Sequence, residues 1–163
     1  MEIERKYLIS ALPPSLQSHR HEEMEQCYLA TSPTLRIRKA GDVCTMTFKR
    51  QRSNAVGAIS NVEVEFPIPL DKYVALCEER VGEIVRKTRY YVPLPNGYTA
   101  ELDVFSGTHE GLCIVEVEFP SLDASVKFSK PAWFGEEVSS DKRYRNMFLA
   151  LNGTALAAEA RKY

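Results

Sequence analysis

The sequence MEIERKYLI, residues 1–9, alternates charged and apolar side chains from its second position. In an extended chain successive side chains point to opposite faces, so Glu2, Glu4 and Lys6 would share one face. The residues between them are mainly apolar and would share the other face. A single strand of this kind is typical of a sheet with one packed and one solvated face.

The same alternation returns in several further segments, which predicts β-strands with one apolar and one ionised face. The charges are segregated by sign: segments 62–66, 101–104 and 115–119 carry acids alone, and segments 35–39 and 87–91 carry bases alone. A solvated surface normally mixes the two signs. We therefore interpret the ionised faces as the lining of a barrel, with a sandwich whose charged faces are solvated as the alternative.

Charged faces inside a barrel require counter-ions, because buried charges persist only when they are paired or bind a metal. Carboxylates are hard ligands for Mg²⁺ or Mn²⁺, while Arg and Lys neutralise a phosphate chain. Acids and bases in one cavity therefore predict a metal-bound triphosphate. The acids on these faces are Glu63, Glu65, Glu101, Asp103, Glu116 and Glu118, and the bases include Arg36, Arg38, Lys49, Lys87 and Arg89.

Length and composition indicate a single domain over residues 1–163. With 44% hydrophobic and 26% charged residues and a formal net charge of -1, the chain has no general attraction to nucleic acid or membranes. The four cysteines form no C-x-x-C pair, and the first residues contain no signal-type apolar run. We expect buried free thiols and a cytoplasmic location.

Helix signals occur in residues 70–82 and 139–153, each ending at a glycine. We expect the Ala-rich tail, residues 154–163, to form a short helix or to be disordered. The histidines lie in polar, loop-like stretches, so we also expect His109 and the other two at the surface.

The opening segment resembles that of the CYTH superfamily, the triphosphate tunnel metalloenzymes, whose signature E-x-E-x-K falls on Glu2, Glu4 and Lys6. The similarity continues in family order through CYLA, LRIRK, TFK, VEVEFPIPL, KTRYYV, ELDVF, GLCIVEVEF and WFGEEVSSDKRYRN, to about residue 150. The resemblance implies a mainly β, α+β fold. This fold is a closed eight-stranded antiparallel tunnel barrel with a charged lumen and a few flanking helices.

The resemblance also implies roles for individual residues. Lys6 and Tyr28 are similar to a pair that helps to activate the attacking water. The chain departs from the usual pattern at Cys27, where relatives often have Gly, and at Asn61, where they often have Arg. The implied triphosphate clamp consists of Arg36, Arg38, Lys49, Lys87 and Arg89. The implied ligands for Mg²⁺ or Mn²⁺ are Glu2, Glu4, Glu63, Glu65, Asp103, Glu116 and Glu118.

The function that we expect is divalent-metal-dependent hydrolysis of inorganic triphosphate or a related small triphosphate. The alternatives are a class IV-like adenylyl cyclase, a thiamine triphosphatase, and a non-catalytic module that binds polyphosphate or a nucleotide. The expected partner is the small-molecule substrate, with no nucleic acid and no membrane, and the expected state is a monomer or a homodimer.

Overall fold

One strongly curved antiparallel sheet organises the chain. The computed structural model describes residues 3–53 and 59–153, so Glu2 and the tail 154–163 lie outside the described residues. The strands follow the sheet in the order β5-β4-β3-β2-β6-β7-β8-β1-β9, and neighbouring strands are antiparallel. The strands are β1 (Ile3–Ile9), β2 (His21–Thr31), β3 (Thr34–Ala40), β4 (Val43–Ser53), β5 (Ile59–Pro67), β6 (Val81–Pro93), β7 (Thr99–Ser106), β8 (Cys113–Phe119) and β9 (Phe134–Glu137).

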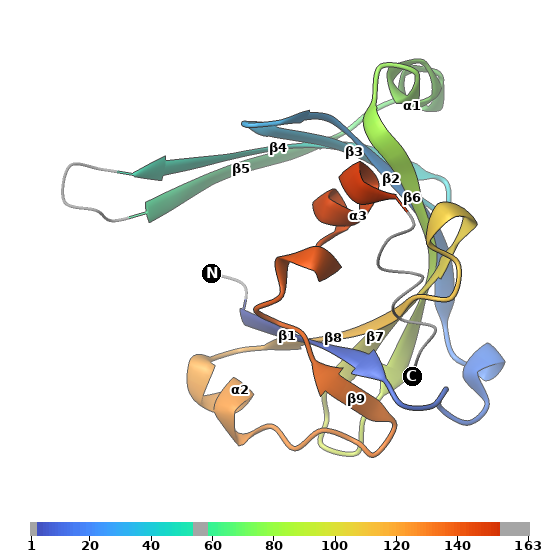
Figure 1. Cartoon of the computed structure of the whole chain (residues 1–163), viewed down its shortest axis with the longest axis vertical. Coiled ribbons are helices and arrows are strands. Elements are labelled where there is room, and N and C mark those ends of the chain that lie inside the picture. Colours follow the sequence, from blue (N-terminus) through green and yellow to red (C-terminus); the bar gives the residue numbers. More distant parts are fainter. Residues whose placement is uncertain (1–2, 54–58, 154–163) are drawn as a thin grey trace.

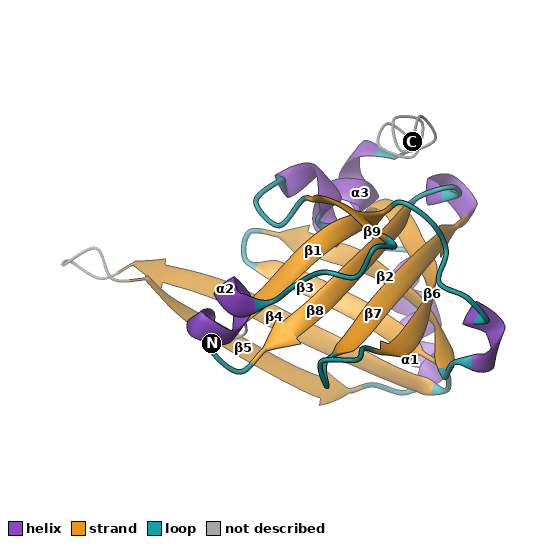
Figure 2. Cartoon of the chain, turned by 90° about the horizontal axis from the view of Figure 1, so that it is seen from below, coloured by secondary structure: helices purple, strands orange, loops and turns teal. Residues whose placement is uncertain are grey.

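Three α-helices accompany the sheet: α1 (Leu70–Cys77), α2 (Leu122–Lys127) and α3 (Asn146–Asn152). Figure 1 shows the sheet as a C-shaped section, with α3 inside the curve and α1 and α2 outside it. Figure 2 shows the strands crossing one another steeply as the sheet curls, with the β4–β5 hairpin projecting at one side. We call the face that is turned toward α3 the concave face.

The mainly β antiparallel fold with a few flanking helices is confirmed, and the described sheet has one strand more than the eight expected. The described sheet has nine strands and ends at β5 and β9. The additional strand, β9, pairs with β1 through Tyr7 and Glu137 and through Ile9 and Phe134. Gly135 permits this approach, because a Cβ atom there would lie 3.2 Å from the carbonyl carbon of Ile9. β9 therefore occupies the free edge of β1, and no ladder joins β9 to β5 within the described residues.

Gly82 was expected to end the first helix, but α1 ends at Cys77 and Gly82 lies in β6. Its φ is +74°, and a Cβ atom on it would lie 2.3 Å from the carbonyl oxygen of Ala150 in α3. The glycine thus marks the point where β6 meets α3. The second expected helix is divided into a 3₁₀ turn at Lys142–Tyr144 and α3 itself.

The concave face is apolar at one end and ionised along the rest. On β1 the ionised Lys6 is followed on the same face by buried Leu8, and on β7 Asp103 is followed by buried Phe105. Leu8 and Phe105 belong to the core cluster that packs against Leu149 of α3. Along each strand, the apolar residue that packs against α3 therefore lies two residues from the nearest charged residue on the same face.

His109 was expected at the surface, but its side chain is fully buried in the 3₁₀ turn Gly107–His109 that follows β7. Its Nε2 atom donates a hydrogen bond to the carbonyl oxygen of Leu149 at 2.7 Å. Since a carbonyl oxygen only accepts, Nε2 carries the proton. This bond fixes the last turn of α3, a contact that the polar local sequence gave no reason to expect.

The outer face of β2 and β3 packs beneath α1, where Cys27, Cys44 and Cys77 are buried as free thiols. None of the described helices combines the length and the apolar character that crossing a membrane requires.

Candidate active site

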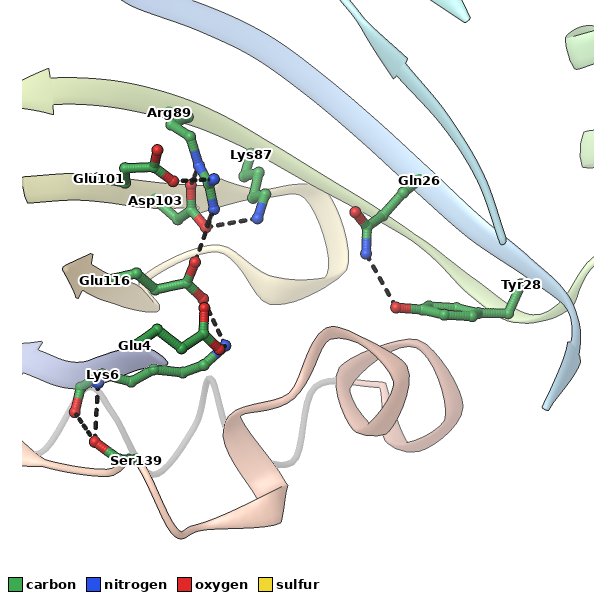
Figure 3. Close-up of polar contacts among 10 residues, drawn as sticks. All are labelled: Glu4, Lys6, Gln26, Tyr28, Lys87, Arg89, Glu101, Asp103, Glu116 and Ser139. Atoms are coloured by element: carbon green, nitrogen blue, oxygen red, sulfur yellow. Dashed lines mark hydrogen bonds and ion pairs between the residues drawn. The ribbon is translucent and has the colours of Figure 1, made fainter. Parts of the chain in front are cut away.

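A network of ion pairs crosses the concave face from β1 to β6 (Figure 3). The strand register places Lys6 opposite Glu116 and Arg89 opposite Asp103. The Lys6 ammonium lies 2.6 Å from Glu116 Oε1 and 3.2 Å from Glu4 Oε1. The Arg89 guanidinium places Nε 2.7 Å from Asp103 Oδ1 and Nη2 3.1 Å from Glu116 Oε2. Glu116 therefore joins two cations that come from β1 and β6.

Lys87 and Glu101 extend this network. Lys87 Nζ lies 2.5 Å from Asp103 Oδ2, and both side chains are almost completely buried. Arg89 also pairs with Glu101, so one guanidinium contacts three carboxylates. Figure 3 shows these side chains gathered on the same side of the sheet, pointing toward one another.

Burial and ion pairing oppose each other at Asp103. Burial by itself raises the pKa of this carboxyl group, but Lys87 and Arg89 more than offset the effect and hold the pKa below its ordinary value. Burial lowers the pKa of Lys87, because the attraction of Asp103 does not fully compensate for lost hydration and for the nearby Arg89. In both groups the charge of the partner therefore opposes the effect of burial.

At Lys6 the neighbouring carboxylates outweigh burial, which is the opposite of the result at Lys87. Burial disfavours its charge, but Glu116 and then Glu4 raise the pKa of Lys6 above the ordinary lysine value. Burial by itself raises the pKa of Glu116, but nearby cations, Lys6 first among them, more than offset this effect and hold the pKa below its usual range. Glu101 differs, because burial and the neighbouring acids outweigh Arg89 and raise its pKa. Lys6 is thus held protonated in this arrangement.

A second group of charges lies on β3, β4 and β5. Arg36 Nη2 donates to Thr47 Oγ1 at 3.1 Å, and Thr47 Oγ1 donates to Glu65 Oε2 at 2.7 Å. Arg36 also lies 3.6 Å from Glu65, and Lys49 pairs with Glu63 at 3.0 Å. The Lys49 and Glu63 side chains are 49% and 44% exposed, so this pair is open to solvent and to a ligand.

Arg38 differs from the other expected clamp cations. Its Nε donates to the amide oxygen of Gln26 at 3.2 Å. Among the residues that the structure describes, no carboxylate lies within ion-pair distance of it. Burial, followed by the positive charges of Arg36 and Arg89, lowers the pKa of Arg38 below the ordinary arginine value. A partly buried cation beside two other cations is stabilised by an anionic ligand.

Lys6 and Tyr28 lie apart in this structure. Figure 3 draws Tyr28 with Gln26 at one side of the concave face and Lys6 with Glu116 at the other. The Tyr28 hydroxyl accepts a hydrogen bond from Gln26 Nε2 at 3.1 Å. Burial raises the pKa of Tyr28, although nearby arginines and Gln26 favour its ionised form. Lys6 and Tyr28 share no hydrogen bond within the described chain, so they could act together only on a molecule bound between them.

The structure brings most of the expected residues onto one face and leaves a few at its margins. Glu118 lies opposite Glu4 in the register and is exposed. Glu2 lies outside the described residues. Sequence reasoning missed the contacts of Glu101, although its place two residues before Asp103 puts both on one face. It also missed two polar residues of the network, Gln26 and Thr47.

The donor chemistry of this face suits a hard divalent cation, because its ligands are carboxylate oxygens. In the arrangement observed, no three His, Cys, Asp or Glu side chains of the described chain converge closely enough to hold a metal ion. The described carboxylates that face the site are mostly paired with Lys or Arg instead. A metal ion would therefore have to compete with these cations for the oxygens.

A cavity of about 800 Å³ lies beside the start of β2 and the middle of β6. Arg20, Glu22, Lys39 and Asp42 are among the residues that line it, and Lys87 is the lining residue that also belongs to the ion-pair network. The cavity therefore adjoins the charged face through the buried Lys87.

Comparison with known proteins places this geometry in a family. The model of the CYTH domain matches residues 1–148. The chain belongs to the CYTH domain family. An inorganic triphosphatase of Nitrosomonas europaea is 43% identical over 155 residues, which cover 93% of this chain and 97% of the relative. An inorganic triphosphatase of Acetivibrio thermocellus is 33% identical over 156 residues, covering 93% and 94%.

A solved structure is similar over the same length. The crystal structure of the inorganic triphosphatase NE1496 matches with a TM-score of 0.75 at 40% identity, covering 93% of this chain and 95% of the other. The family assignment therefore agrees in sequence and in fold, and the charged concave face lies within the matched part of the chain.

Proposed function

We propose that this protein is a divalent-metal-dependent phosphohydrolase that cleaves inorganic triphosphate or a related small triphosphate on its concave face. The observation that carries the proposal is Arg38, a partly buried arginine that has no carboxylate partner among the described residues. Such a cation would be stabilised by binding a small, highly charged anion. The names of the two CYTH relatives support a triphosphate as that anion.

The clamp would be formed by cations from both sides of the curve. Arg36, Arg38 and Lys49 come from β3 and β4, while Lys87 and Arg89 come from β6. Because Arg offers planar paired donors and Lys a compact charge, the set can contact several phosphate oxygens at once. On binding, the phosphate chain would take over cations that now pair with acids.

The acids released from these pairs would hold the metal. In the proposal the ligands for Mg²⁺ or Mn²⁺ are Glu4, Glu63, Glu65, Asp103, Glu116 and Glu118. The bound ion supplies charge neutralisation and polarisation of the phosphoryl group. Glu4, Glu116 and Glu118 lie on adjacent strands β1 and β8, whose register sets Glu4 opposite Glu118.

Lys6 and Tyr28 would act on the attacking water from opposite sides of the bound phosphate. The ammonium of Lys6 is held by Glu116 and Glu4, so it orients water as a donor until those contacts loosen. The hydroxyl of Tyr28 can donate its own proton toward the site, because its oxygen already accepts from Gln26.

The buried free thiols of the described chain support a reducing compartment such as the cytoplasm.

The test is a product assay with Mg²⁺ or Mn²⁺ over inorganic triphosphate, ATP and thiamine triphosphate. We expect the protein to release orthophosphate and pyrophosphate from inorganic triphosphate. Cyclic AMP from ATP, turnover restricted to thiamine triphosphate, or binding without turnover would each overturn the proposal in favour of a different function.

The role of Arg38 is tested in the same assay with a matched pair of variants. Arg38→Met should lower kcat/KM by about tenfold to a thousandfold, the range for losing a charge-assisted phosphate contact. Arg86→Met removes an arginine that is half exposed and pairs with Glu25, so its kinetics should match the parent. Equal effects of the two substitutions would exclude Arg38 from the clamp.

A further inference from the structure

Gln26 is buried on β2, with its side chain on the same face as Tyr28, and it bridges two residues of the proposed site. Its exposed fraction is 1%. Its amide oxygen accepts from Arg38 Nε at 3.2 Å, and its amide nitrogen donates to the Tyr28 hydroxyl at 3.1 Å. A buried amide with both ends engaged is held in one orientation.

The direction of these bonds follows from the chemistry of Arg38. A guanidinium has only donors, so the group that faces it must be the amide oxygen of Gln26. The amide NH₂ then has to face Tyr28, and the phenol oxygen has to accept. The phenol proton is thereby left free to point away from Gln26.

We propose that Gln26 is a positioning residue that orients the hydroxyl of Tyr28 for the reaction and couples this orientation to ligand binding at Arg38. The inference rests on the proposed function, since it assigns Arg38 to the clamp and Tyr28 to the water. Arg38 can keep Nε on Gln26 while its terminal nitrogens bind a phosphate oxygen, because the guanidinium carries five N–H donors. Movement of Arg38 toward the ligand is then transmitted through one amide to Tyr28.

The electrostatics agree with this arrangement. The charges of Arg36 and Arg38 and the hydrogen bond from Gln26 all favour the ionised phenol and partly counter the burial that raises the pKa of Tyr28. A donor aimed at the phenol oxygen stabilises negative charge on it and strengthens the phenol as a donor to water.

A double-mutant cycle on kcat separates positioning from general packing. Gln26→Met keeps the size of the side chain and removes both hydrogen bonds, so kcat should fall about fivefold to tenfold, the scale of one lost hydrogen bond. In a Tyr28→Phe background the same substitution should change kcat less than about twofold, because the hydroxyl that it positions is gone. A full fall in that background would overturn the proposal.

Gln26→Glu isolates the bond to Tyr28. A carboxylate still accepts from Arg38 but cannot donate, so it accepts a hydrogen bond from the phenol O–H and the direction of the bond is reversed. We expect kcat to fall at least as far as in Gln26→Met, although the contact to Arg38 is kept. A variant with parental kcat would show that the direction of the bond is unimportant.

A spectroscopic readout does not depend on turnover. With ¹³Cζ-labelled tyrosine, the Tyr28 signal, assigned with Tyr28→Phe, should move when inorganic triphosphate and Mg²⁺ are added to the parent protein. In Gln26→Met the signal should start at a different shift and no longer respond. Gln17→Met is the matched control, because Gln17 donates a hydrogen bond of 3.2 Å to Tyr90 on the outer face; it should leave the Tyr28 response intact.

The outcomes distinguish the inference from the function on which it rests. A parent that releases no orthophosphate defeats the proposed function, and the Tyr28 signal of ligand-free Gln26→Met still tests whether Gln26 positions the hydroxyl of Tyr28. An unchanged Tyr28 signal in that variant, or a ligand response equal to the parent's, defeats the inference even if the parent hydrolyses triphosphate.

Discussion

Arg89 and Asp103 form a bidentate ion pair, in which Arg89 Nε lies 2.7 Å from Asp103 Oδ1 and Arg89 Nη2 lies 2.8 Å from Asp103 Oδ2. The Asp103 carboxylate also contacts Lys87, so one buried acid is shared by two cations. An acid held in this way stabilises the fold, and it also keeps two proposed clamp residues in place before any ligand arrives.

We expect the stability that Asp103 contributes to depend on pH. Its pKa is lower in the folded protein than the ordinary value of about 4, so the contribution is full above that pH and is lost as the pH falls through the folded pKa. Asp103→Asn should cost about 3–5 kcal/mol near neutral pH, because it leaves the buried Lys87 without its carboxylate partner and removes one of the three carboxylates that Arg89 contacts. Urea unfolding of the parent and the variant near neutral pH and at about pH 3 measures both effects.

The control is Asp123→Asn, whose partner Lys127 and whose own side chain are both more than 70% exposed. A surface pair is worth roughly 0–1 kcal/mol, so this variant should unfold almost like the parent at both pH values. Asp103→Asn variants as stable as Asp123→Asn variants would contradict the assignment.

Glu116 links Lys6 and Arg89, and the same oxygens are proposed to hold the metal. Glu116→Gln should weaken Mn²⁺ binding and reduce kcat by about a hundredfold or more, because a neutral amide removes charge from an oxygen-ligand site and leaves its shape. Calorimetric Mn²⁺ titration gives a readout that is independent of turnover. Glu79→Gln, at an exposed position after α1, is the control and should bind Mn²⁺ like the parent.

The alternation of the sequence was enough to predict which residues share the concave face. Segregation of acids and bases by sign indicated a ligand site, since most of these strands carry a single charge type on the face they share, and the first strand carries both. The ninth strand could not be foreseen, because β9 is four residues long and pairs with β1 where Gly135 closely approaches Ile9. His109 was missed because its partner Leu149 is distant in sequence, and Gln26 was missed because it is uncharged, although Arg38 lies opposite it in the β2–β3 register.

The contact between Gly82 and α3 predicts a steric effect that a matched glycine can isolate. Gly82→Ala places a methyl group 2.3 Å from the Ala150 carbonyl oxygen and also forces alanine to a φ of +74°. Gly97 has a φ of +83° with no atom within 4 Å, so Gly97→Ala carries the backbone strain alone, about 1–2 kcal/mol.

The difference between the two variants in unfolding free energy therefore reports the packing of α3 on β6. We expect Gly82→Ala to be clearly the less stable, by about 1–3 kcal/mol as for other overpacked sites. Equal losses would mean that α3 can move away from β6 without cost.

Lys6 provides the last prediction, because its contacts bear on how water is activated. Glu116 and Glu4 raise the pKa of Lys6, so a base role requires that ligand binding first draw these acids away. Lys6→Arg keeps the positive charge but does not deprotonate at any accessible pH. If Lys6 accepts a proton, kcat should fall by about a hundredfold or more with little change in KM, and the rise of the rate with pH that reports deprotonation of Lys6 should disappear. Lys127→Arg, on the exposed surface of α2, should leave both quantities unchanged. A Lys6→Arg enzyme with most of the parental kcat would show instead that Lys6 acts as a fixed cation that positions water or phosphate.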